Sequence, residues 1–342
     1  MKNRQWTLAR RPKGEPVMAD FGFQETDVPT PGEGQVLART LYLSLDPYMR
    51  GRMNDGPSYA EPTAIGDVMT AGTVAQVVES KDSRYKPGDL VVGYGGWQDY
   101  WVLPAGEIYK AVTGTYPLSY NLGLVGMPGM TAYTGLMRIG EPKAGETVVV
   151  AAASGAVGAV VGQIAKRLGC RVVGIAGSAD KCRYVVEKLG FDACISHRSP
   201  TMAEEIKAAC PHGIDVYFEN VGGPVFEAVF PLMNDFSRIP VCGLIAYYNA
   251  ASREDLASPY RAPDILFALL TKRIRMQGFI VMDTWREMFG NFIRDMEKWV
   301  AEKPFEYAED MVDGLEAAPE AFMGLLKGKN FGKVVVKVAD PA

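Results

Sequence analysis

Residues 148–158 read VVVAAASGAVG, and residues 159–169 continue with apolar side chains at helical spacing. An apolar run, a tight turn of small residues and a helix are typical of the first unit of a dinucleotide-binding βαβ fold. Gly155 would let the backbone approach a pyrophosphate, and Gly158 would let the helix pack closely on the strand. The amino end of that helix would then face the anion.

The turn departs from the usual G-x-G-x-x-G pattern at one position, because Ala153 stands in place of the first glycine. A turn of small residues that serves only close packing inside an α/β protein is the alternative interpretation. The position of the turn in the first strong strand–helix–strand unit of the chain favours the cofactor site.

From residue 126 onward, strand-length apolar runs alternate with helix-length segments. We expect strands at 146–152 and 171–176 and helices at 156–168 and 179–189. The alternation continues to about residue 274. Repeated strand–helix units predict an α/β fold with a doubly wound parallel sheet of the Rossmann type.

Before residue 126 the chain has short stretches rich in β-branched and aromatic side chains, separated by Pro and Gly. They predict an irregular, mainly-β lobe with strands at 35–45, 72–78, 90–94 and 100–103.

The end of the chain fits the same lobe, because the pieces after the amphipathic stretch 285–301, including a final strand at 333–338, are too short for further strand–helix units. The 342 residues also exceed the ~250–300 that one core usually holds. We therefore expect a mainly-β domain, 1–125 with 306–342, and a dinucleotide-binding domain, 126–305.

Composition excludes several classes of protein. Hydrophobic residues make up 48% and charged residues 22%, which is typical of a folded chain, and the net charge of -4 argues against a nucleic-acid partner. The five cysteines form no C-x-x-C pair, which predicts no disulfide framework and a reducing, cytoplasmic setting. We expect no secretory signal, and the strand–turn–helix pattern explains the uncharged segment 147–165 better than a membrane span does.

The end of the second strand predicts which dinucleotide binds. An NAD site usually carries an acidic residue there, whereas this strand ends in Gly177, and Lys181 follows one helical turn later. A lysine at this place suits the 2′-phosphate of NADP. Asp180 is the competing residue, but an acid is also favourable in the first turn of a helix that Ser178 would cap. Lys181 as a solvated helix residue is the other interpretation.

Zinc ligands and a nucleophilic triad are both missing. The only histidines, His197 and His212, fall in the α/β part, and the first lobe contains neither Cys nor His. A catalytic zinc site needs such ligands, so we expect no metal. Ser154 lies outside a G-x-S-x-G motif, and no histidine is placed to serve it.

Further motifs are spread over nearly the whole chain. They are SLDPYMRG at 44–51, VGMPGMTAY at 125–133, the glycine turn, ENVGG at 219–223, Cys242-Gly243, Tyr248-Asn249 and KNFGK at 329–333. Together they resemble the zinc-free medium-chain dehydrogenase/reductase superfamily, in its prostaglandin reductase and bacterial curcumin reductase branch.

This resemblance implies a GroES-like catalytic domain beside the Rossmann domain, and zinc-independent reduction by NADPH of the carbon–carbon double bond of α,β-unsaturated ketones or aldehydes. It also implies which residues bind the cofactor. They are Met127, Thr131, Gly155, Ala156, Val157, Gly158, Gly177, Lys181, His197, Asn220, Gly243, Tyr248, Phe279, Val281 and Asn330. His197, followed by Arg198, stands where the family usually has a tyrosine; it would replace that contact with a cation or leave the 2′-phosphate less tightly held.

Tyr248 is the expected catalytic residue, because a phenol that is neutral at physiological pH can donate a hydrogen bond and then a proton to the carbonyl oxygen of the substrate. A wall residue that stacks on nicotinamide or substrate is the alternative role. Tyr48 is expected with Tyr248 in the substrate pocket, although a structural role for Tyr48 and Arg50 fits equally well. The polar segment 248–262 predicts a loop over the substrate.

The expected partner is a small hydrophobic enone or enal, with neither nucleic acid nor membrane, and the chain is expected to form a homodimer through the edge of its α/β sheet. Two other functions stay open. An NADPH quinone reductase would use the same domains, and an NADPH-binding scaffold of low turnover would bind cofactor without reducing enones.

Overall fold

The computed structural model describes residues 2–56, 58–114, 116–252, 254–256, 258, 260 and 262–342. The chain divides into two compact units, Met1–Gly126 with Glu309–Ala342, and Met127–Ala308. Four positions in the loop expected at 248–262, namely 253, 257, 259 and 261, lie outside the described residues.

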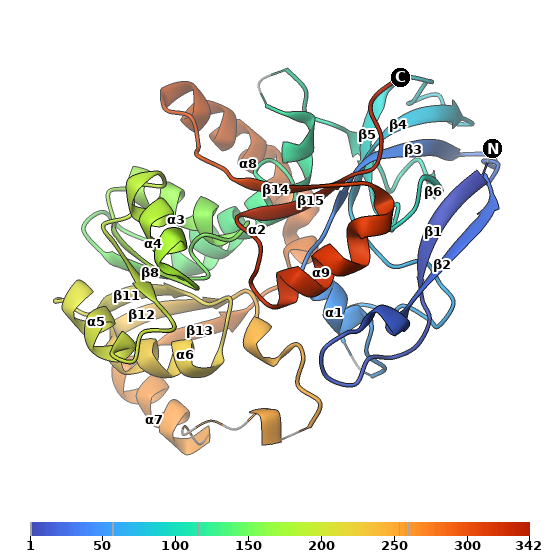
Figure 1. Ribbon diagram of the computed structural model, residues 1–342. Helices are drawn as coiled ribbons and strands as arrows, with labels where there is room; N and C mark the ends of the chain where they lie inside the picture. The colour runs from blue at the N-terminus through green and yellow to red at the C-terminus, as the bar shows by residue number, and fades with distance from the viewer. Residues whose placement is uncertain are drawn as a thin grey trace. The chain divides into compact units, whose positions relative to one another are not determined.

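The first unit is built around a sheet of mostly antiparallel strands (Figure 1). Its strand order is β14-β15-β3-β4-β5-β7, and β6 also pairs with β3; β1 and β2 form a separate hairpin-like pair. The strands are β1 (Lys2–Leu8), β2 (Phe21–Asp27), β3 (Gln35–Ser44), β4 (Thr73–Ser80), β5 (Leu90–Gly93), β6 (Tyr100–Pro104), β7 (Tyr109–Lys110), β14 (Glu309–Asp313) and β15 (Lys333–Lys337).

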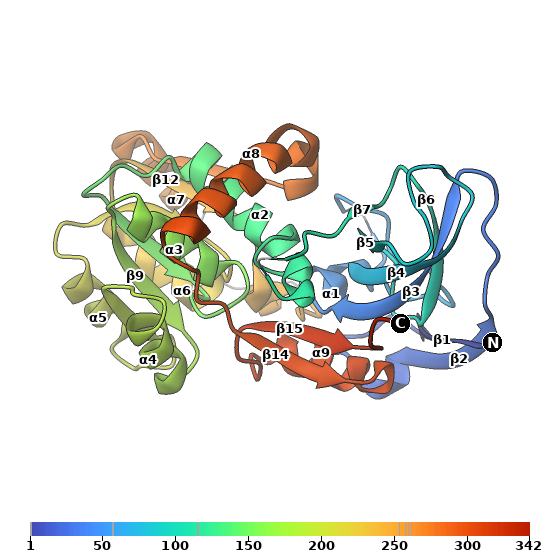
Figure 2. The ribbon, with the colours of Figure 1, turned by 90° about the horizontal axis from the view of Figure 1, so that it is seen from above.

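Short helices connect these strands: η1 (Met18–Asp20), α1 (Tyr48–Arg52), η2 (Leu118–Leu122), η7 (Leu315–Ala317) and α9 (Ala318–Leu326). The last strands of the chain lie beside the early ones, since β15 pairs antiparallel with β3 (Figure 2). Trp97 stacks on Phe21 at 5.7 Å and meets the edge of Phe322 from α9, so residues from both ends of the sequence share one core.

The second unit is an α/β layer structure with one parallel sheet. The sheet has the order β10-β9-β8-β11-β12-β13, and each neighbouring pair is parallel. Its strands are β8 (Thr147–Ala151), β9 (Arg171–Ala176), β10 (Ala193–Ser196), β11 (Ile214–Phe218), β12 (Met233–Val241) and β13 (Arg275–Gly278). The order reverses beside β8, which makes the doubly wound fold, and the predicted fold class is confirmed.

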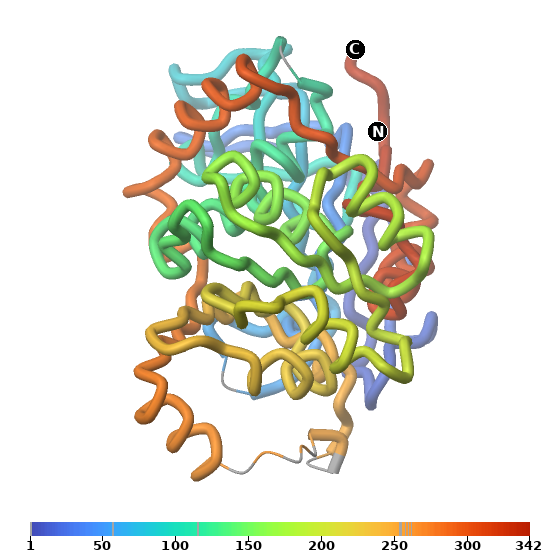
Figure 3. The backbone as a smooth tube through the Cα atoms, turned by 90° about the vertical axis from the view of Figure 1, so that its left-hand side faces the viewer, coloured from blue at the N-terminus to red at the C-terminus, as the bar shows by residue number. Residues whose placement is uncertain are grey.

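Helices cover both faces of this sheet. Figure 1 shows α3, α4 and α8 on one face and α5, α6 and α7 on the other, and Figure 3 follows the backbone from α3 and α4 (yellow-green) to α7 (orange). The elements are α2 (Met127–Thr134), η3 (Gly135–Gly140), α3 (Gly158–Arg167), α4 (Ala179–Glu187), α5 (Met202–Ala209), α6 (Gly223–Val229), η4 (Phe230–Leu232), η5 (Ile245–Tyr247), η6 (Glu254–Leu256), α7 (Ala262–Lys272) and α8 (Val281–Glu302).

Element boundaries differ from the predicted ones by a few residues. The helix expected from residue 156 begins at Gly158, because Ala152 has a left-handed backbone with φ of 52° and residues 152–157 form the turn. The amphipathic stretch expected from 285 begins at Val281. Among the described residues, every helix is too short or too polar to cross a membrane.

Candidate functional site

The glycine turn closes the carboxyl end of β8 onto the start of α3. Gly155 N–H donates to Ala152 O at 2.9 Å, and Ala159 N–H donates to Gly155 O at 3.0 Å. A Cβ at Gly158 would lie 2.4 Å from Ala152 O, so only glycine allows this approach of helix to strand; at Gly155 it would lie 3.1 Å from the same oxygen. Ala156 and Val157 remain partly exposed, so the turn can be reached by a ligand.

Basic side chains gather at the carboxyl end of β9. Ser178 caps α4 by accepting from Lys181 N–H at 3.3 Å, and a Cβ at Gly177 would touch the His197 ring at 3.3 Å. Burial, with the positive charges of Arg198 and Lys181, lowers the pKa of His197. The three basic groups are therefore close enough to interact electrostatically, and an anion placed among them would be stabilised.

Asp180, the residue that competes for a ribose hydroxyl, is engaged elsewhere. Its exposed carboxylate pairs with Arg183 one turn further along α4. An acid in the first turn of a capped helix is favourable in itself, and this placement agrees with the helix-stabilising interpretation.

Asn220, Gly243 and Tyr248 lie where β11 and β12 end. The Asn220 amide donates to Ala151 O at 2.8 Å, which ties the end of β11 to the end of β8. A Cβ at Gly243 would lie 3.1 Å from the Tyr248 hydroxyl oxygen, and Leu244 N–H donates to that oxygen at 3.4 Å. The structure thus brings these three residues to the same sheet edge as the glycine turn.

Met127 and Thr131 occupy α2, with the Thr131 hydroxyl donating to Met127 O at 2.7 Å. Gly135 follows this helix, and a Cβ there would lie 2.6 Å from the ring of Phe279. Phe279 in turn meets Phe218 edge to face at 6.4 Å, at the end of β11. Val281 is buried as the first residue of α8.

Glu219 belongs to this edge too, although sequence reasoning gave it no role. It is 1% exposed, and its carboxylate accepts hydrogen bonds from the Tyr217 hydroxyl at 2.8 Å and from the backbone N–H groups of Val221 and Gly222 at 2.5 and 2.9 Å. Burial raises the pKa of Glu219 against these hydrogen bonds. The ENVGG motif was the available signal, because an acid before two glycines can serve a turn.

Tyr48 and Asn330 lie in the first unit. The Tyr48 hydroxyl is buried without a hydrogen-bond partner among the described residues, and burial, with Tyr94 and Asp46 adding, raises its pKa well above the ordinary value. The Asn330 amide donates to Gly332 O at 2.7 Å.

Two of the quoted motifs meet inside the first unit through an ion pair. The Lys333 ammonium is buried and donates to Asp46 Oδ1 at 3.0 Å and to Leu45 O at 2.6 Å. Arg50 is also buried, with its guanidinium donating to Gly14 O at 2.7 Å and Asn54 Oδ1 at 2.6 Å. These contacts support a structural role for Arg50.

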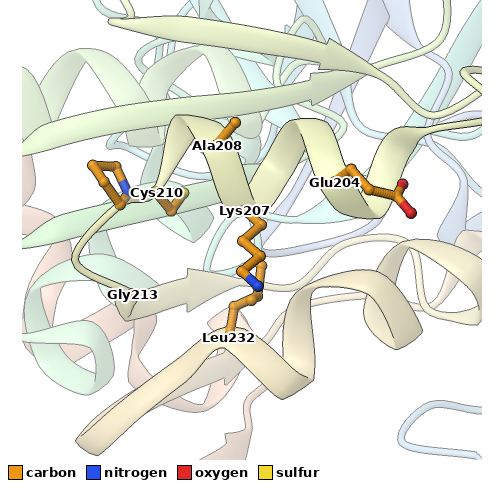
Figure 4. A pocket seen from close by; sticks show the side chains of 7 residues that line it. Glu204, Lys207, Ala208, Cys210, Gly213 and Leu232 are labelled. Carbon is orange, nitrogen blue, oxygen red and sulfur yellow. The ribbon is translucent and has the colours of Figure 1, made fainter.

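A hollow among the described residues lies elsewhere. It measures about 510 Å³ and is lined by residues at the amino ends of β11 and β12, the opposite edge from the glycine turn (Figure 4). Glu204 and Lys207 stand at its rim with Leu232 across from them. Among the described residues no three His, Cys, Asp or Glu side chains lie together as metal ligands would.

Two family models match the chain. One describes the N-terminal domain of oxidoreductases and matches residues 4–111, and the other describes zinc-binding dehydrogenases and matches residues 156–298.

Similar proteins cover the chain from end to end. It is 56% identical to the NADPH-dependent curcumin reductase of Escherichia coli over 99% of this chain and 97% of that protein. It is 42% identical to the NADP(+)-dependent 2-alkenal reductase of Nicotiana tabacum over 99% and 98%. The crystal structure of CurA from Vibrio vulnificus in complex with NADPH superposes with a TM-score of 0.94 at 52% identity, covering 99% of this chain and 100% of that one.

Proposed function

Since the chain belongs to the medium-chain dehydrogenase/reductase superfamily, in the prostaglandin and curcumin reductase branch, we propose that it uses NADPH to reduce the carbon–carbon double bond of α,β-unsaturated ketones and aldehydes. The family expected from the sequence motifs is confirmed. The observation that carries the proposal is one sheet edge that holds a glycine turn, a group of basic side chains and a tyrosine hydroxyl.

The residues at this edge fit NADPH. The turn leaves no room for a Cβ at Gly158 and little at Gly155, which suits a backbone cradle for a pyrophosphate, and the amino end of α3 favours an anion. Lys181, His197 and Arg198 suit the 2′-phosphate, which carries close to two negative charges at neutral pH. The remaining residues that we propose to line the cofactor are Met127, Thr131, Ala156, Val157, Gly177, Asn220, Gly243, Tyr248, Phe279, Val281 and Asn330.

NADPH, when bound, supplies a hydride to the β-carbon of the double bond. Tyr248 stabilises the negative charge that develops on the carbonyl oxygen, first by donating a hydrogen bond and then by releasing its proton. Leu244 N–H points at the phenol oxygen from 3.4 Å and would stabilise the phenolate that remains.

Tyr48 is proposed to contact the substrate. Its buried hydroxyl without a partner is a group that a substrate carbonyl would satisfy, and its ring offers apolar area to a hydrophobic enone.

The test is oxidation of NADPH, followed at its absorbance band, with simple enones, quinones and saturated aldehydes, each with and without a chelator. We expect turnover of enones with NADPH preferred over NADH and no effect of the chelator. Faster turnover of quinones than of enones would favour the quinone reductase, and NADPH binding without any turnover would favour the scaffold.

We also propose that the chain acts as a cytoplasmic homodimer. Its five cysteines are all free thiols, which suits a reducing compartment. The strand β13 is at the edge of its sheet, and the neighbouring helix α7 exposes 64% of Leu266, 69% of Phe267 and 75% of Leu270. An apolar helix face beside an open strand edge is suited to a second copy.

A further inference from the structure

Glu219 is buried at the carboxyl end of β11 with three hydrogen-bond donors around its carboxylate. No basic side chain among the described residues forms an ion pair with it. A buried carboxylate of this kind is costly, and here its acceptor capacity is used mainly by the backbone of Val221 and Gly222. Gly222 and Gly223 have φ of 75° and 54°, a left-handed backbone that glycine adopts readily, and the carboxylate fixes this conformation by accepting from the backbone N–H groups of Val221 and Gly222.

This turn, residues 219–223, forms hydrogen bonds with the segment that follows β12. Glu219 O accepts from the N–H groups of Cys242 and Gly243 at 2.9 and 3.2 Å, and Val221 O accepts from Ala246 N–H at 2.9 Å. Gly223 N–H donates to the Tyr247 hydroxyl at 3.1 Å. The segment that carries Tyr248 is therefore built directly on the turn that Glu219 holds.

The same turn is joined to the glycine turn. Asn220, next to Glu219, donates to Ala151 O at 2.8 Å, one residue before the left-handed Ala152. A Cβ at Gly243 would lie 3.5 Å from Asn220 O, so the two loops pack against each other at this point. A change in the 219–223 turn would reach both the proposed pyrophosphate site and the proposed proton donor.

We propose that Glu219 is a positioning residue, which sets the 219–223 turn so that the glycine turn and Tyr248 are held in the arrangement that NADPH and substrate require. It acts through these segments and is not assigned a contact with substrate or cofactor. The inference rests on the proposed function, because the groups that it positions are those of the proposed reductase.

The variant Glu219→Gln tests this role with little change in volume. The groups that bind the carboxylate are all donors, whereas a glutamine side chain offers one acceptor oxygen and an amide NH2 group that only donates. With its oxygen at the two backbone N–H groups and its NH2 at the Tyr217 hydroxyl, glutamine still replaces a carboxylate by a neutral acceptor, so the hydrogen bonds that hold the turn become weaker. Tyr217→Phe removes just the hydroxyl bond and leaves the two backbone bonds in place.

A matched control comes from the opposite end of the same strand. The Asp215 carboxylate accepts from Thr147 N–H and from the Asn234 amide, both at 2.8 Å, and lies at the edge away from the glycine turn. Asp215→Asn therefore measures how far the melting temperature falls when this sheet loses a structural carboxylate away from the proposed site.

We expect Glu219→Gln to raise the Kd for NADPH about tenfold and to lower kcat at saturating NADPH about tenfold, as replacing a charged acceptor by a neutral one in these hydrogen bonds would. Tyr217→Phe and Asp215→Asn should leave both within about twofold, even where the melting temperature falls. Binding is measured by NADPH fluorescence and stability by thermal melting.

Two results would overturn the inference: Glu219→Gln with wild-type Kd and kcat but a melting temperature lowered as in Asp215→Asn, or a wild-type protein that fails to bind NADPH. Failure of the proposed function alone is distinguishable. In that case the wild-type protein binds NADPH without reducing enones, and the Kd values of the variants still decide the role of Glu219.

Discussion

Tyr248 carries the residue-scale prediction that bears most directly on the chemistry. Tyr248→Phe keeps the ring and removes the proton, so we expect kcat to fall about 10²-fold or more, the usual contribution of a general acid, while the KM for NADPH changes little. Steady-state rates with a simple enone measure both. Tyr85→Phe is the control, since the Tyr85 hydroxyl donates to Ile108 O at 2.7 Å inside the first unit and has no place in the proposed site. Wild-type kcat in Tyr248→Phe would leave this residue as a wall of the pocket.

Lys181 decides between the two nicotinamide cofactors in our proposal. Lys181→Ala removes a cation from the group with His197 and Arg198, and we expect the KM for NADPH to rise about 10- to 100-fold while the KM for NADH stays the same. Arg183→Ala on the same helix is the control, because Arg183 is exposed and pairs with Asp180. Equal losses with NADPH and NADH would contradict a role at the 2′-phosphate.

At the scale of elements, the junction of β8 and α3 depends on Gly158. The methyl group of Gly158→Ala would lie 2.4 Å from Ala152 O, and backbone cannot yield as a flexible side chain would. We expect the free energy of unfolding to fall by about 1–3 kcal/mol and NADPH binding to weaken with it. Urea unfolding and NADPH fluorescence measure the two effects.

Gly290→Ala in α8 is the matched control for that change. A Cβ at Gly290 meets nothing within 4 Å, and alanine is favoured over glycine inside a helix. This variant should gain about 0.5–1 kcal/mol in the free energy of unfolding and bind NADPH as the wild type does. A Gly158→Ala variant as stable as Gly290→Ala would show that the junction can relax.

Local sequence patterns predict where most helices and strands lie. They do not predict which residues of different helices and strands contact one another. The strand, turn and helix at 147–167 follow from apolar spacing and glycines within 21 consecutive residues, so the sequence is sufficient there. The hydrogen bonds from Val221 and Gly222 to the Glu219 carboxylate also join residues close in sequence. The positioning role that we propose for Glu219 depends on residues 242–248. Only the pairing of β11 with β12 brings these residues close to Glu219.

At the scale of the whole molecule, motif resemblance supplied information that periodicity could not. Asp46 and Lys333 are 287 residues apart, and no spacing rule predicts their buried ion pair. Both belong to motifs that were noted for their resemblance to one family, and the pair joins the first and last parts of the first unit. Such a pair is expensive to bury unless its hydrogen bonds are complete, and Lys333 also donates to Leu45 O and Val334 O.

The association of two chains is the remaining prediction at this scale. The face of α7 with Leu266, Phe267 and Leu270 exposes apolar area to water, which is unfavourable. The strand β13 offers unpaired backbone groups at the edge of its sheet. A two-fold axis at this edge would cover both features in each copy at once, because the same surface serves both partners.

We therefore expect the wild-type protein to have about twice the chain mass of 37.2 kDa in solution by light scattering. The double variant Phe267→Glu with Leu270→Glu should have the mass of one chain, because two carboxylates would have to be buried without partners in the interface. Val186→Glu on α4, at another partly exposed apolar position, should remain a dimer. A wild-type protein with the mass of a single chain at micromolar concentration would remove the dimer, whereas a dimer that survives in the double variant would move its interface away from α7.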